Sequence, residues 1–504
     1  MDSILTVDWP ADGLRAKVKI LRPLIPILLF GAAIRYLYQL AYRPWWGGDS
    51  GGYSGPFYLW SHHHLTDGAR TPMYPLFLGW AQWLTASKPA VVISASSALA
   101  ATGMQNLFGL VTALLVYLTL RALGVGARFA SIAATGFSLI AAVGQFEMIM
   151  LPFSLSLFTL MLGACFFVLT LGRIGRGTPN RFFELFTGGI FGVGALVRAD
   201  NLVVLVILIA VVGLHAVRGY AEPAQRIVAR RLLRFCLLAP VGAAPWLLGW
   251  MTVNAIGIRQ FRLTTIMGYQ NTEAVYNLWD RVEAKDKILG EIMFKHFQLT
   301  NPPGTTKRDF IWEANPEIQA RVAELPVVIT HPAMQHIDVG DYLGQVSRNL
   351  AERFPKVWLD NALDRFFNGT FIFHFPQTSP GLRSDPASVD GKEVIKRPKL
   401  WVWMVKLDQI EAPGLGLCYL LTLGWAVFGP IRLARAGSFN AIEDLAVTAL
   451  ALGTVGTFVA FCLLEGFFTQ YSEPHLGVMV ICATYTVHRM WVRAPRAPIP
   501  AEKC

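Results

Sequence analysis

Long apolar runs separated by short polar connections dominate the pattern of the chain. Each run is of the length that an α-helix needs to cross the hydrocarbon core of a bilayer, which is about 30 Å thick. The runs lie near residues 21–41, 97–120, 129–147, 152–172, 184–199, 201–217, 235–255, 412–432, 443–465 and 474–492. The pattern therefore predicts an all-α polytopic membrane protein with about ten transmembrane helices.

The connections between the runs alternate in charge. Basic residues gather in every second connection, which is the distribution that the positive-inside rule predicts for cytoplasmic loops. These arginines are Arg121, Arg128, Arg173, Arg176, Arg181, Arg218, Arg226, Arg230, Arg231, Arg234, Arg432, Arg435, Arg489, Arg493 and Arg496. A cytoplasmic N-terminus puts them all on one side and both chain ends inside. Basic residues between 15 and 22 precede the first run without a small-residue cleavage site, which favours a retained first helix over a removed signal peptide.

The outer side receives two long polar segments. Residues 42–96 form the first outer loop, and residues 256–411 contain most of the acidic residues, several proline clusters and no spanning run. Within the second segment, 308–325 and 341–367 carry apolar residues at helical spacing, which predicts amphipathic helices. We therefore expect an N-terminal transmembrane catalytic module over 1–255, a mainly helical outer cap over 256–411, and C-terminal transmembrane helices with a cytoplasmic tail over 412–504.

Composition agrees with a membrane protein. Of the 504 residues, 54% are hydrophobic and 15% are charged, whereas soluble domains carry about 25% charged residues. The net charge of +11 comes from the short connections, and no stacking platform or basic groove is evident, so nucleic-acid binding is not expected. Five of the six cysteines fall inside apolar runs and the sixth is the last residue. They are predicted to be small core side chains, not disulfide or zinc partners.

Residues 45–78 combine the groups that a membrane-interface site needs. Asp49 is surrounded by glycines, a series of aromatic residues follows, and Arg70 begins the turn Arg-Thr-Pro-Met-Tyr-Pro. Amphipathic aromatic side chains are enriched in the headgroup zone of a bilayer. A carboxylate beside an arginine at that depth is suited to acting on a lipid-phosphate substrate.

Two motifs in this stretch carry a family resemblance. GGDSGGY at 47–53 followed by RTPMYPLFLGW at 70–80 resembles the polyprenyl-phosphate-sugar-dependent glycosyltransferases of the GT-C fold. The branch most similar contains the protein mannosyltransferases and the aminoarabinose transferase of lipid A. Weaker matches follow in order at 146–162, 195–205, 331–350 and 469–481. The chain departs from the family pattern at Ala199, where proline is usual, and at Gln470, where arginine is common.

The resemblance implies an inverting transfer of a sugar from a polyprenyl-phosphate donor to an acceptor hydroxyl on the outer membrane face. Asp49 would be the general base, and an Asp at that position could alternatively cap a short interfacial helix. Glu147, at the outer end of the third run, would be a second acidic residue that steers the acceptor or holds a metal. The alternative for Glu147 is a carboxylate at the membrane edge that reaches water.

The phosphate candidates are cations and hydroxyls on the outer side. Guanidinium groups bind phosphate bidentately and keep their charge. The candidates are Arg70, Arg198 and Arg259, joined by Arg262, by Tyr53 and Tyr74 as hydrogen-bond donors, and by His475 near the lipid headgroup. Two alternatives stay open: a local pair of Arg198 with Asp200, and aromatic-belt anchoring for the two tyrosines.

Metal and cofactor requirements stay open on the sequence. The consecutive His62, His63 and His64 cannot all face one ion on a helix, so they indicate a solvated interfacial segment more than a metal site. No metal ligands and no cofactor are assigned, although a divalent metal would suit the acidic pair. The sequon at Asn368 is interpreted as chance.

Two other functions compete with the glycosyltransferase. A transporter or flippase of lipid-linked glycans should carry charged or broken helices in paired halves at mid-membrane, and no inverted repeat is evident. A ligase using a diphosphate-linked glycan would share the topology. The expected partners are a polyprenyl-phosphate-linked sugar, a lipid, glycan or protein acceptor, and membrane lipids. The expected location is a bacterial inner membrane with the active site on the periplasmic or extracellular side.

Overall fold

The computed structural model describes residues 22–45, 50–62, 65–66, 68–302, 310–370, 398–435, 442–464 and 473–493. Within these ranges the regular elements are helices and no strand occurs. A parallel bridge between Trp45 and Ile149 stands by itself.

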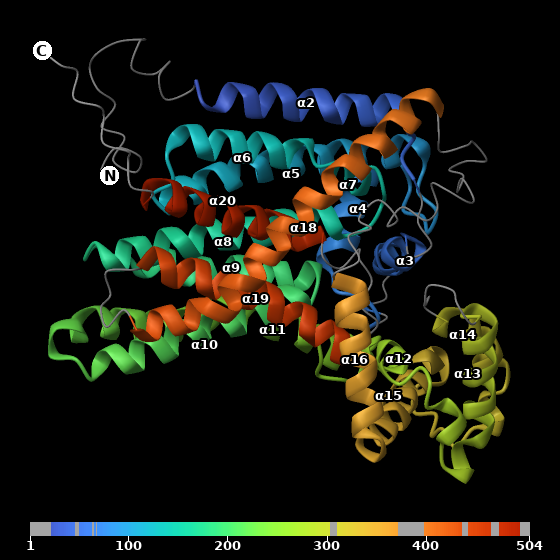
Figure 1. The fold of residues 1–504 in the computed structure, drawn as a ribbon. Coiled ribbons are helices and arrows are strands. Elements are labelled where there is room, and N and C mark those ends of the chain that lie inside the picture. Colours follow the sequence, from blue (N-terminus) through green and yellow to red (C-terminus); the bar gives the residue numbers. More distant parts are fainter. Residues whose placement is uncertain are drawn as a thin grey trace, which may run out of the picture.

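A bundle of long helices forms the larger part of the molecule (Figure 1). Its helices are α2 (Leu24–Ala41), α5 (Ala95–Ala122), α6 (Ala127–Leu139), α7 (Ala141–Glu147), α8 (Phe153–Gly175), α9 (Arg181–Val197), α10 (Asp200–Tyr220), α11 (Arg226–Ile258), α18 (Pro398–Arg435), α19 (Ile442–Leu464) and α20 (Leu476–Arg493). Single-turn helices η1 (Pro223–Gln225) and η8 (Glu473–His475) precede α11 and α20.

The bundle helices fit the expected spans. Seven helices of the described part, α2, α5, α8, α10, α11, α18 and α19, are long and apolar enough to cross a membrane. The pair α6 and α7 forms an eighth candidate, bent by 51° at Ile140, whose backbone leaves the helical region. Helices α9 and α20, of 17 and 18 residues, are shorter. Each predicted apolar run falls on a helix or on this bent pair, so the prediction of an all-α polytopic membrane protein is confirmed.

Helices α9 and α11 cross at close range because glycines lie at the crossing. A Cβ atom on Gly188 would lie 1.7 Å from the carbonyl oxygen of Ala239, and one on Gly242 would lie 1.9 Å from that of Leu185. Helices in lipid gain little from the hydrophobic effect, so close backbone approach at small residues stabilises their association. The crossing holds α9 against α11 and thereby positions Arg198, which follows the last residue of α9.

A smaller helical unit, which we call the cap, lies beside one end of the bundle (Figure 1). Its α-helices are α12 (Met267–Ala274), α13 (Lys287–Thr300), α14 (Ile311–Ala320), α15 (Gln335–Arg353) and α16 (Pro355–Thr370), and its single turns are η2 (Trp279–Arg281), η3 (Ala284–Asp286), η4 (Val322–Glu324) and η5 (Pro332–Met334). A separate hydrophobic core that includes Trp279, Met293, Phe310 and Leu343 holds it together.

The helix boundaries in the cap and in the segment after it differ from two expectations drawn from the sequence. Residues 341–367 are not one helix: α15 ends at Arg353, Phe354 leaves the helical region, and α16 starts at Pro355. A proline disfavours helical backbone in the preceding residue and lacks the N–H that would continue the helix. Helix α18 begins at Pro398 and runs across the expected boundary between residues 411 and 412.

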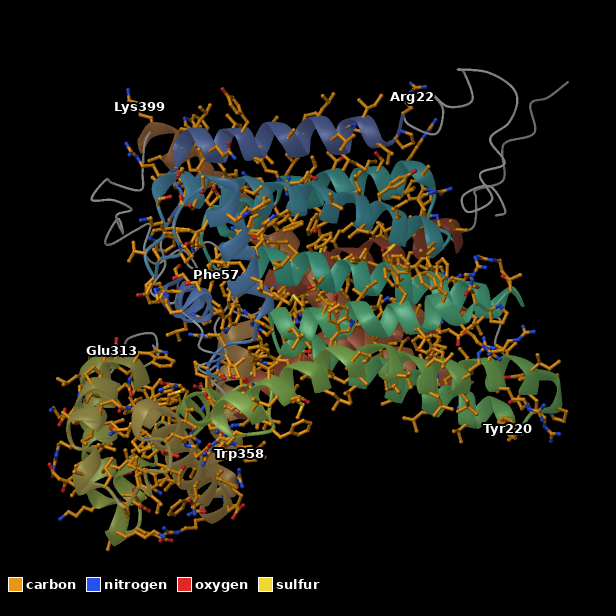
Figure 2. The ribbon with its side chains drawn as sticks, turned by 180° about the vertical axis from the view of Figure 1, so that it is seen from behind. Arg22, Phe57, Tyr220, Glu313, Trp358 and Lys399 are labelled. Atoms are coloured by element: carbon orange, nitrogen blue, oxygen red, sulfur yellow. The ribbon has the colours of Figure 1, made fainter. Side chains whose placement is uncertain are left out.

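Side chains of α16 bind the cap to the end of α19. The Trp358 indole N–H donates to the Leu463 carbonyl at 2.9 Å, and the Arg365 guanidinium donates to the Cys462 carbonyl at 2.9 Å. The last carbonyls of a helix have no partner within the helix, so these donors satisfy buried acceptors that would otherwise destabilise the end of α19. Seen from behind, Trp358 and Glu313 lie near one end of the bundle while Arg22 and Tyr220 lie at the other (Figure 2).

Candidate active site

The first outer loop is hydrogen-bonded to the turn that follows Glu147. The Trp45 N–H donates to the Met148 carbonyl at 2.8 Å, and the Met150 N–H donates to the Trp45 carbonyl at 3.0 Å. The hydroxyl of Ser50, the first described residue after 46–49 in the chain, donates to the Met150 carbonyl at 2.9 Å. Asp49, the expected base, lies outside the described residues. Its described neighbours Trp45 and Ser50 both bind the 148–150 segment.

Arg70 lies against an aromatic pair. Its guanidinium carbon is 4.5 Å from the ring centroid of Tyr53, and Nη1 is 3.4 Å from the Tyr53 hydroxyl. The Tyr53 ring contacts Tyr74 edge to face at 5.3 Å. A cation over an aromatic face is attracted by the ring quadrupole, so Tyr53 orients the guanidinium. Tyr53 belongs to α3 (Ser50–Ser61), and Arg70 precedes α4 (Met73–Leu84).

Tyr74 connects this pair to the turn after Glu147. Its buried hydroxyl donates to the Gln105 side-chain carbonyl at 2.9 Å. The amide nitrogen of Gln105 then donates to the carbonyls of Glu147 and Ile149, both at 2.8 Å. Gln105 is a site residue that the sequence analysis missed; the signal available was an amide inside an apolar run, where an unsatisfied polar group is costly.

One hydrogen bond brings the backbone of the two leading phosphate candidates together. The hydroxyl of Thr71, the residue after Arg70, donates to the carbonyl of Val197, the residue before Arg198, at 3.2 Å. The Arg198 guanidinium lies 4.8 Å from the Phe153 ring centroid, and its Nε pairs with Asp200 at 3.2 Å. The local Arg198–Asp200 pair, which the sequence offered as the alternative for Arg198, is therefore present. It lies next to the hydrogen bond between Thr71 and Val197.

His475 lies near the same ion pair. It is 1% exposed, its Nδ1 is 3.3 Å from the Thr454 hydroxyl, and its Nε2 has no hydrogen-bond partner among the described residues. Asp200 and Arg198 both act on His475 electrostatically, and its Nε2 can form a hydrogen bond to a bound group.

Glu147 does not reach water. Its side chain is 0% exposed, and Oε1 pairs with Nη2 of Arg35 at 2.6 Å. Arg35, in α2, also donates to the Gly31 carbonyl at 3.0 Å. A Cβ atom on Gly109 would lie 1.6 Å from Oε1 of Glu147, so α5 needs glycine there. The alternative of a water-exposed membrane-edge carboxylate is wrong, because the bend at Ile140 turns α7 into the bundle instead of towards the surface.

Arg35 is the partner that the sequence analysis missed. A lone arginine within the first apolar run was the available signal, since ionisable groups inside spanning helices need a partner.

Arg259 directly follows α11, at the end of the helix that the cap contacts. It follows Ile258, and the Ile258 side chain occupies the space where a Cβ atom on Gly68 would lie. Arg259 adopts a left-handed backbone with φ of 56°, its side chain is exposed, and it makes no hydrogen bond or ion pair with a described residue. Arg262 is engaged instead, by Asp341 at 2.6 Å.

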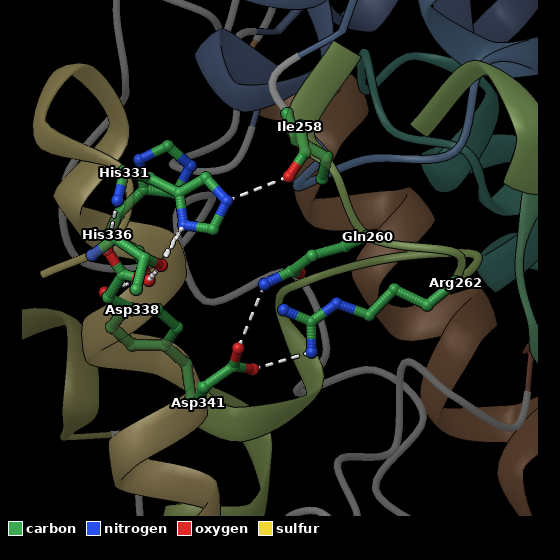
Figure 3. Close-up of polar contacts among 9 residues, drawn as sticks. Ile258, Gln260, Arg262, His331, His336, Asp338 and Asp341 are labelled. Carbon is green, nitrogen blue, oxygen red and sulfur yellow. Dashed lines mark hydrogen bonds and ion pairs between the residues drawn. The ribbon is translucent and has the colours of Figure 1, made fainter. Parts of the chain in front are cut away.

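The cap is also hydrogen-bonded to this end of α11 (Figure 3). His331 contacts the Ile258 carbonyl through Nε2 at 2.9 Å and the Asp338 carboxylate through Nδ1 at 2.8 Å. Asp341 accepts from both Gln260 and Arg262. Burial alone would raise the pKa of Asp338, but hydrogen bonds from Thr330 and His331 outweigh it and lower the pKa to about 2. Asp338 is therefore a stable anion at neutral pH.

Of the three consecutive histidines, only His62 lies within the described residues. His62 is exposed and its Nδ1 is 2.8 Å from the Tyr58 carbonyl. His63 and His64 lie outside the described residues, and so do the side chains of the sequon that begins at Asn368. Among the residues that the structure describes, no group of three or more His, Cys, Asp or Glu side chains could hold a metal ion.

An apolar groove of about 640 Å³ has a lining that includes Trp60, Leu76, Leu196, Trp246 and Trp250. Its walls come from α3, α4 and the C-terminal parts of α9 and α11. The rings of Trp60 and Trp250 meet edge to face at 6.2 Å, and Trp246 is 44% exposed. Pro72 and Leu196, which lie two residues from Arg70 and Arg198 respectively in the chain, also line it.

Comparisons with known proteins give structural likeness only. No family model and no curated protein match the sequence. Similar structures include the apo oligosaccharyltransferase of Archaeoglobus fulgidus, at 11% identity and a TM-score of 0.49, covering 96% of this chain and 53% of that chain. They also include AglB of the same archaeon with an inhibitory peptide and a dolichol-phosphate, at 13% identity and a TM-score of 0.49, covering 98% of this chain and 53% of that chain.

A bacterial structure is similar as well. ArnT from Cupriavidus metallidurans bound to undecaprenyl phosphate matches at 13% identity and a TM-score of 0.34, covering 92% of this chain and 78% of that chain. This chain spans about half the length of the archaeal oligosaccharyltransferase. Because these identities and TM-scores are low, the likeness carries no conclusion about activity, and function rests on the geometry of the site.

Proposed function

We propose that this protein is a membrane glycosyltransferase of the GT-C type that moves a sugar from a polyprenyl-phosphate donor to an acceptor hydroxyl. The observation that carries the proposal is the hydrogen bond from Thr71 to the Val197 carbonyl. It joins the residue after Arg70 to the residue before Arg198, and Pro72 and Leu196, close to them in the chain, line the apolar groove. An isoprenoid tail and a phosphate head need this combination of apolar walls and adjacent cations.

Donor binding would use the groove and the arginines together. The volume of the groove, about 640 Å³, falls within the usual range of small-molecule sites, about 300–1,000 Å³. The tail would lie against the aromatic walls while Arg70, oriented by Tyr53, binds the phosphate through two N–H groups. Arg198 would supply the second cation, and Tyr74 would hold Tyr53 in place. Arg259, exposed just after the end of α11, would attract the anionic head before it enters.

The chemical step needs a base and a stabilised leaving group. We assign Asp49 as the base: it removes the proton from the acceptor hydroxyl as that oxygen attacks the anomeric carbon. The bond between this carbon and the phosphate oxygen breaks, and its electron pair stays on the oxygen of the departing polyprenyl phosphate. The configuration at the anomeric carbon is thereby inverted. Fixed guanidinium groups stabilise the charge that develops on the phosphate, and a positioned base contributes about 10²–10⁴-fold.

Glu147 and His475 would act by holding other groups. The Glu147 carboxylate is engaged by Arg35, and its carbonyl accepts from Gln105, so we assign it a positioning role for the 148–150 segment that binds both neighbours of residues 46–49. His475 would complete the surroundings of Arg198 and would donate one hydrogen bond to the phosphate from Nε2.

Binding of undecaprenyl phosphate to the purified protein tests the donor site. Arg70→Ala removes a charge-assisted contact worth about 1.5–3 kcal/mol, which weakens binding by about tenfold or more. Lys88→Ala is the matched control, since Lys88 is an exposed cation of the same outer loop. Equal affinity of the Arg70→Ala and Lys88→Ala proteins would exclude Arg70 from the phosphate site.

Release of free undecaprenyl phosphate from a panel of radiolabelled undecaprenyl-phosphate monosaccharides, with membrane extract as acceptor source, tests the reaction. We expect release by the wild type and a loss of about 10²-fold or more in Asp49→Asn. Movement of a fluorescent lipid-linked sugar across the bilayer without release would identify a flippase and overturn the proposal.

A further inference from the structure

A second groove lies between α18 and α20, away from the candidate active site. Its volume is about 540 Å³, and its lining includes Leu421, Trp425, Phe428 and Met490 with Arg432 and Arg489 at one end. Gly424, also in the lining, leaves the hollow open, because a Cβ atom there would meet no atom within 4 Å. Phe428 and Met490 are 67% and 59% exposed, so the groove opens on the surface that faces lipid.

The groove belongs to the end of the bundle opposite the cap. Arg432 and Arg489 lie near the last residues of α18 and α20, next to the start of α19. The side chain of Arg218, near the end of α10, donates to the Ala434 carbonyl, and Tyr220, the last residue of α10, lies at the end away from the cap (Figure 2). This is the arginine-rich side, which the positive-inside rule assigns to the cytoplasmic leaflet.

The two arginines at the end of the groove share one buried carboxylate. Arg432 lies 2.7 Å and Arg489 3.4 Å from the same carboxylate oxygen of Asp444, whose side chain is 2% exposed. The other oxygen of Asp444 accepts from the Tyr485 hydroxyl at 2.7 Å. Two guanidinium groups therefore share one carboxylate, and both arginine side chains remain more than a third exposed.

Aromatic contacts hold the two arginines in place. Arg432 lies over Trp425 at 5.8 Å and Arg489 over Tyr485 at 5.7 Å. The Trp425 indole N–H donates to Thr486 at 2.6 Å, which fixes one wall of the groove across the two helices. Guanidinium groups fixed in this way form a pre-organised fork for phosphate oxygens.

We propose that this groove binds an anionic phospholipid of the adjacent leaflet, with the phosphate at Arg432 and Arg489 and one acyl chain against Trp425 and Phe428. The two exposed guanidinium groups favour an anionic head over a zwitterionic one, because basic pockets between spanning helices on this side attract anionic lipid heads. The apolar walls favour a lipid over free phosphate. The site is separate from the donor groove and does not depend on the proposed transfer reaction.

The test uses the full-length protein in nanodiscs of phosphatidylcholine containing a minority of phosphatidylglycerol, followed by native mass spectrometry of the retained lipids. We expect selective retention of phosphatidylglycerol by the wild type, and retention lower by about tenfold or more in Arg432→Gln/Arg489→Gln, which removes the charge-assisted contacts. Arg435→Gln is the control, since Arg435 is an exposed arginine of the same helix end outside the groove.

A second variant keeps the test independent of the Asp444 ion pairs. Gly424→Leu fills the open space without touching the arginines, so we expect a folded protein that retains about tenfold less phosphatidylglycerol. The proposal would be overturned if Gly424→Leu retained as much phosphatidylglycerol as the wild type. It would also be overturned if the wild type retained phosphatidylcholine as selectively as phosphatidylglycerol, or if Arg435→Gln lost as much phosphatidylglycerol as the double arginine variant. Thermal stabilisation by millimolar inorganic phosphate equal to that by phosphatidylglycerol would identify a phosphate site in place of a lipid site.

Discussion

The buried pair of Glu147 and Arg35 allows a structural role for Glu147 to be separated from a catalytic one. Glu147→Gln keeps the side-chain volume and removes the charge, which leaves the Arg35 guanidinium without its partner at 2.6 Å. The two side chains are 0% and 6% exposed, so water cannot compensate. Removing one partner of a buried ion pair costs about 3–5 kcal/mol, and Arg35→Met should destabilise the protein by a similar amount.

The double variant Arg35→Met/Glu147→Gln provides the internal control. With both charges gone, no unpaired ion remains in the bundle, and replacing a whole buried pair by neutral side chains is often close to neutral. We therefore expect the double variant to be more stable than either single variant. The double-mutant cycle gives the coupling energy between the two side chains directly.

The assay combines equilibrium unfolding in detergent with undecaprenyl phosphate release. Glu313→Gln, an exposed glutamate of the cap, serves as the matched control and should stay within about 0.5 kcal/mol of the wild type. A Glu147→Gln protein with wild-type stability and no activity would refute the ion-pair reasoning and make Glu147 a catalytic residue. Loss of stability that the second substitution restores supports the positioning role.

Three further predictions address the donor groove and the cap. Thr71→Val breaks the bond to the Val197 carbonyl, worth about 0.5–1.5 kcal/mol, and should weaken undecaprenyl phosphate binding by about two- to tenfold in a titration, with Thr85→Val as control. Gly249→Leu fills the donor groove, because a Cβ atom there meets nothing within 4 Å; it should lower affinity without lowering Tm, and unchanged affinity would place the tail elsewhere. The pKa of Asp338, lowered to about 2 from its ordinary 3.8, adds stability that is present above pH 3.8 and is lost as pH falls towards 2. Limited proteolysis of the cap across that window should show this loss in the wild type and a flatter profile in Asp338→Asn.

The spanning helices could be read from the chain because their signal is local. A run such as 201–217 contains enough consecutive apolar residues to cross the bilayer whichever neighbours it packs against, and α10 covers it. The amphipathic pieces of the cap were found for the same reason, since helical spacing is a property of adjacent turns. The break at Pro355 was missed because the apolar spacing continues across it, although the proline itself marked the position.

The candidate site was only partly accessible from the sequence. Arg70 and Tyr53 are 17 residues apart in one loop, and their motif placed them at the membrane interface. Arg35 and Glu147 are 112 residues apart, and nothing in either segment names the other as a partner. Thr71 and Gln105 carry no motif that marks them, because their roles consist of hydrogen bonds to backbone carbonyls of distant segments.

The amino-acid sequence by itself determined that the chain crosses a membrane, which connections are basic, and that a carboxylate and an arginine stand in the first outer loop. Those properties depend on the composition of consecutive residues and on their transfer from water to lipid. Only the tertiary structure decided that the residue after Arg70 is hydrogen-bonded to the residue before Arg198, that Glu147 is buried against Arg35, and that two arginines share Asp444. Such pairings depend on how helices far apart in the chain pack, and short backbone approaches such as that of Gly188 to Ala239 decide that packing.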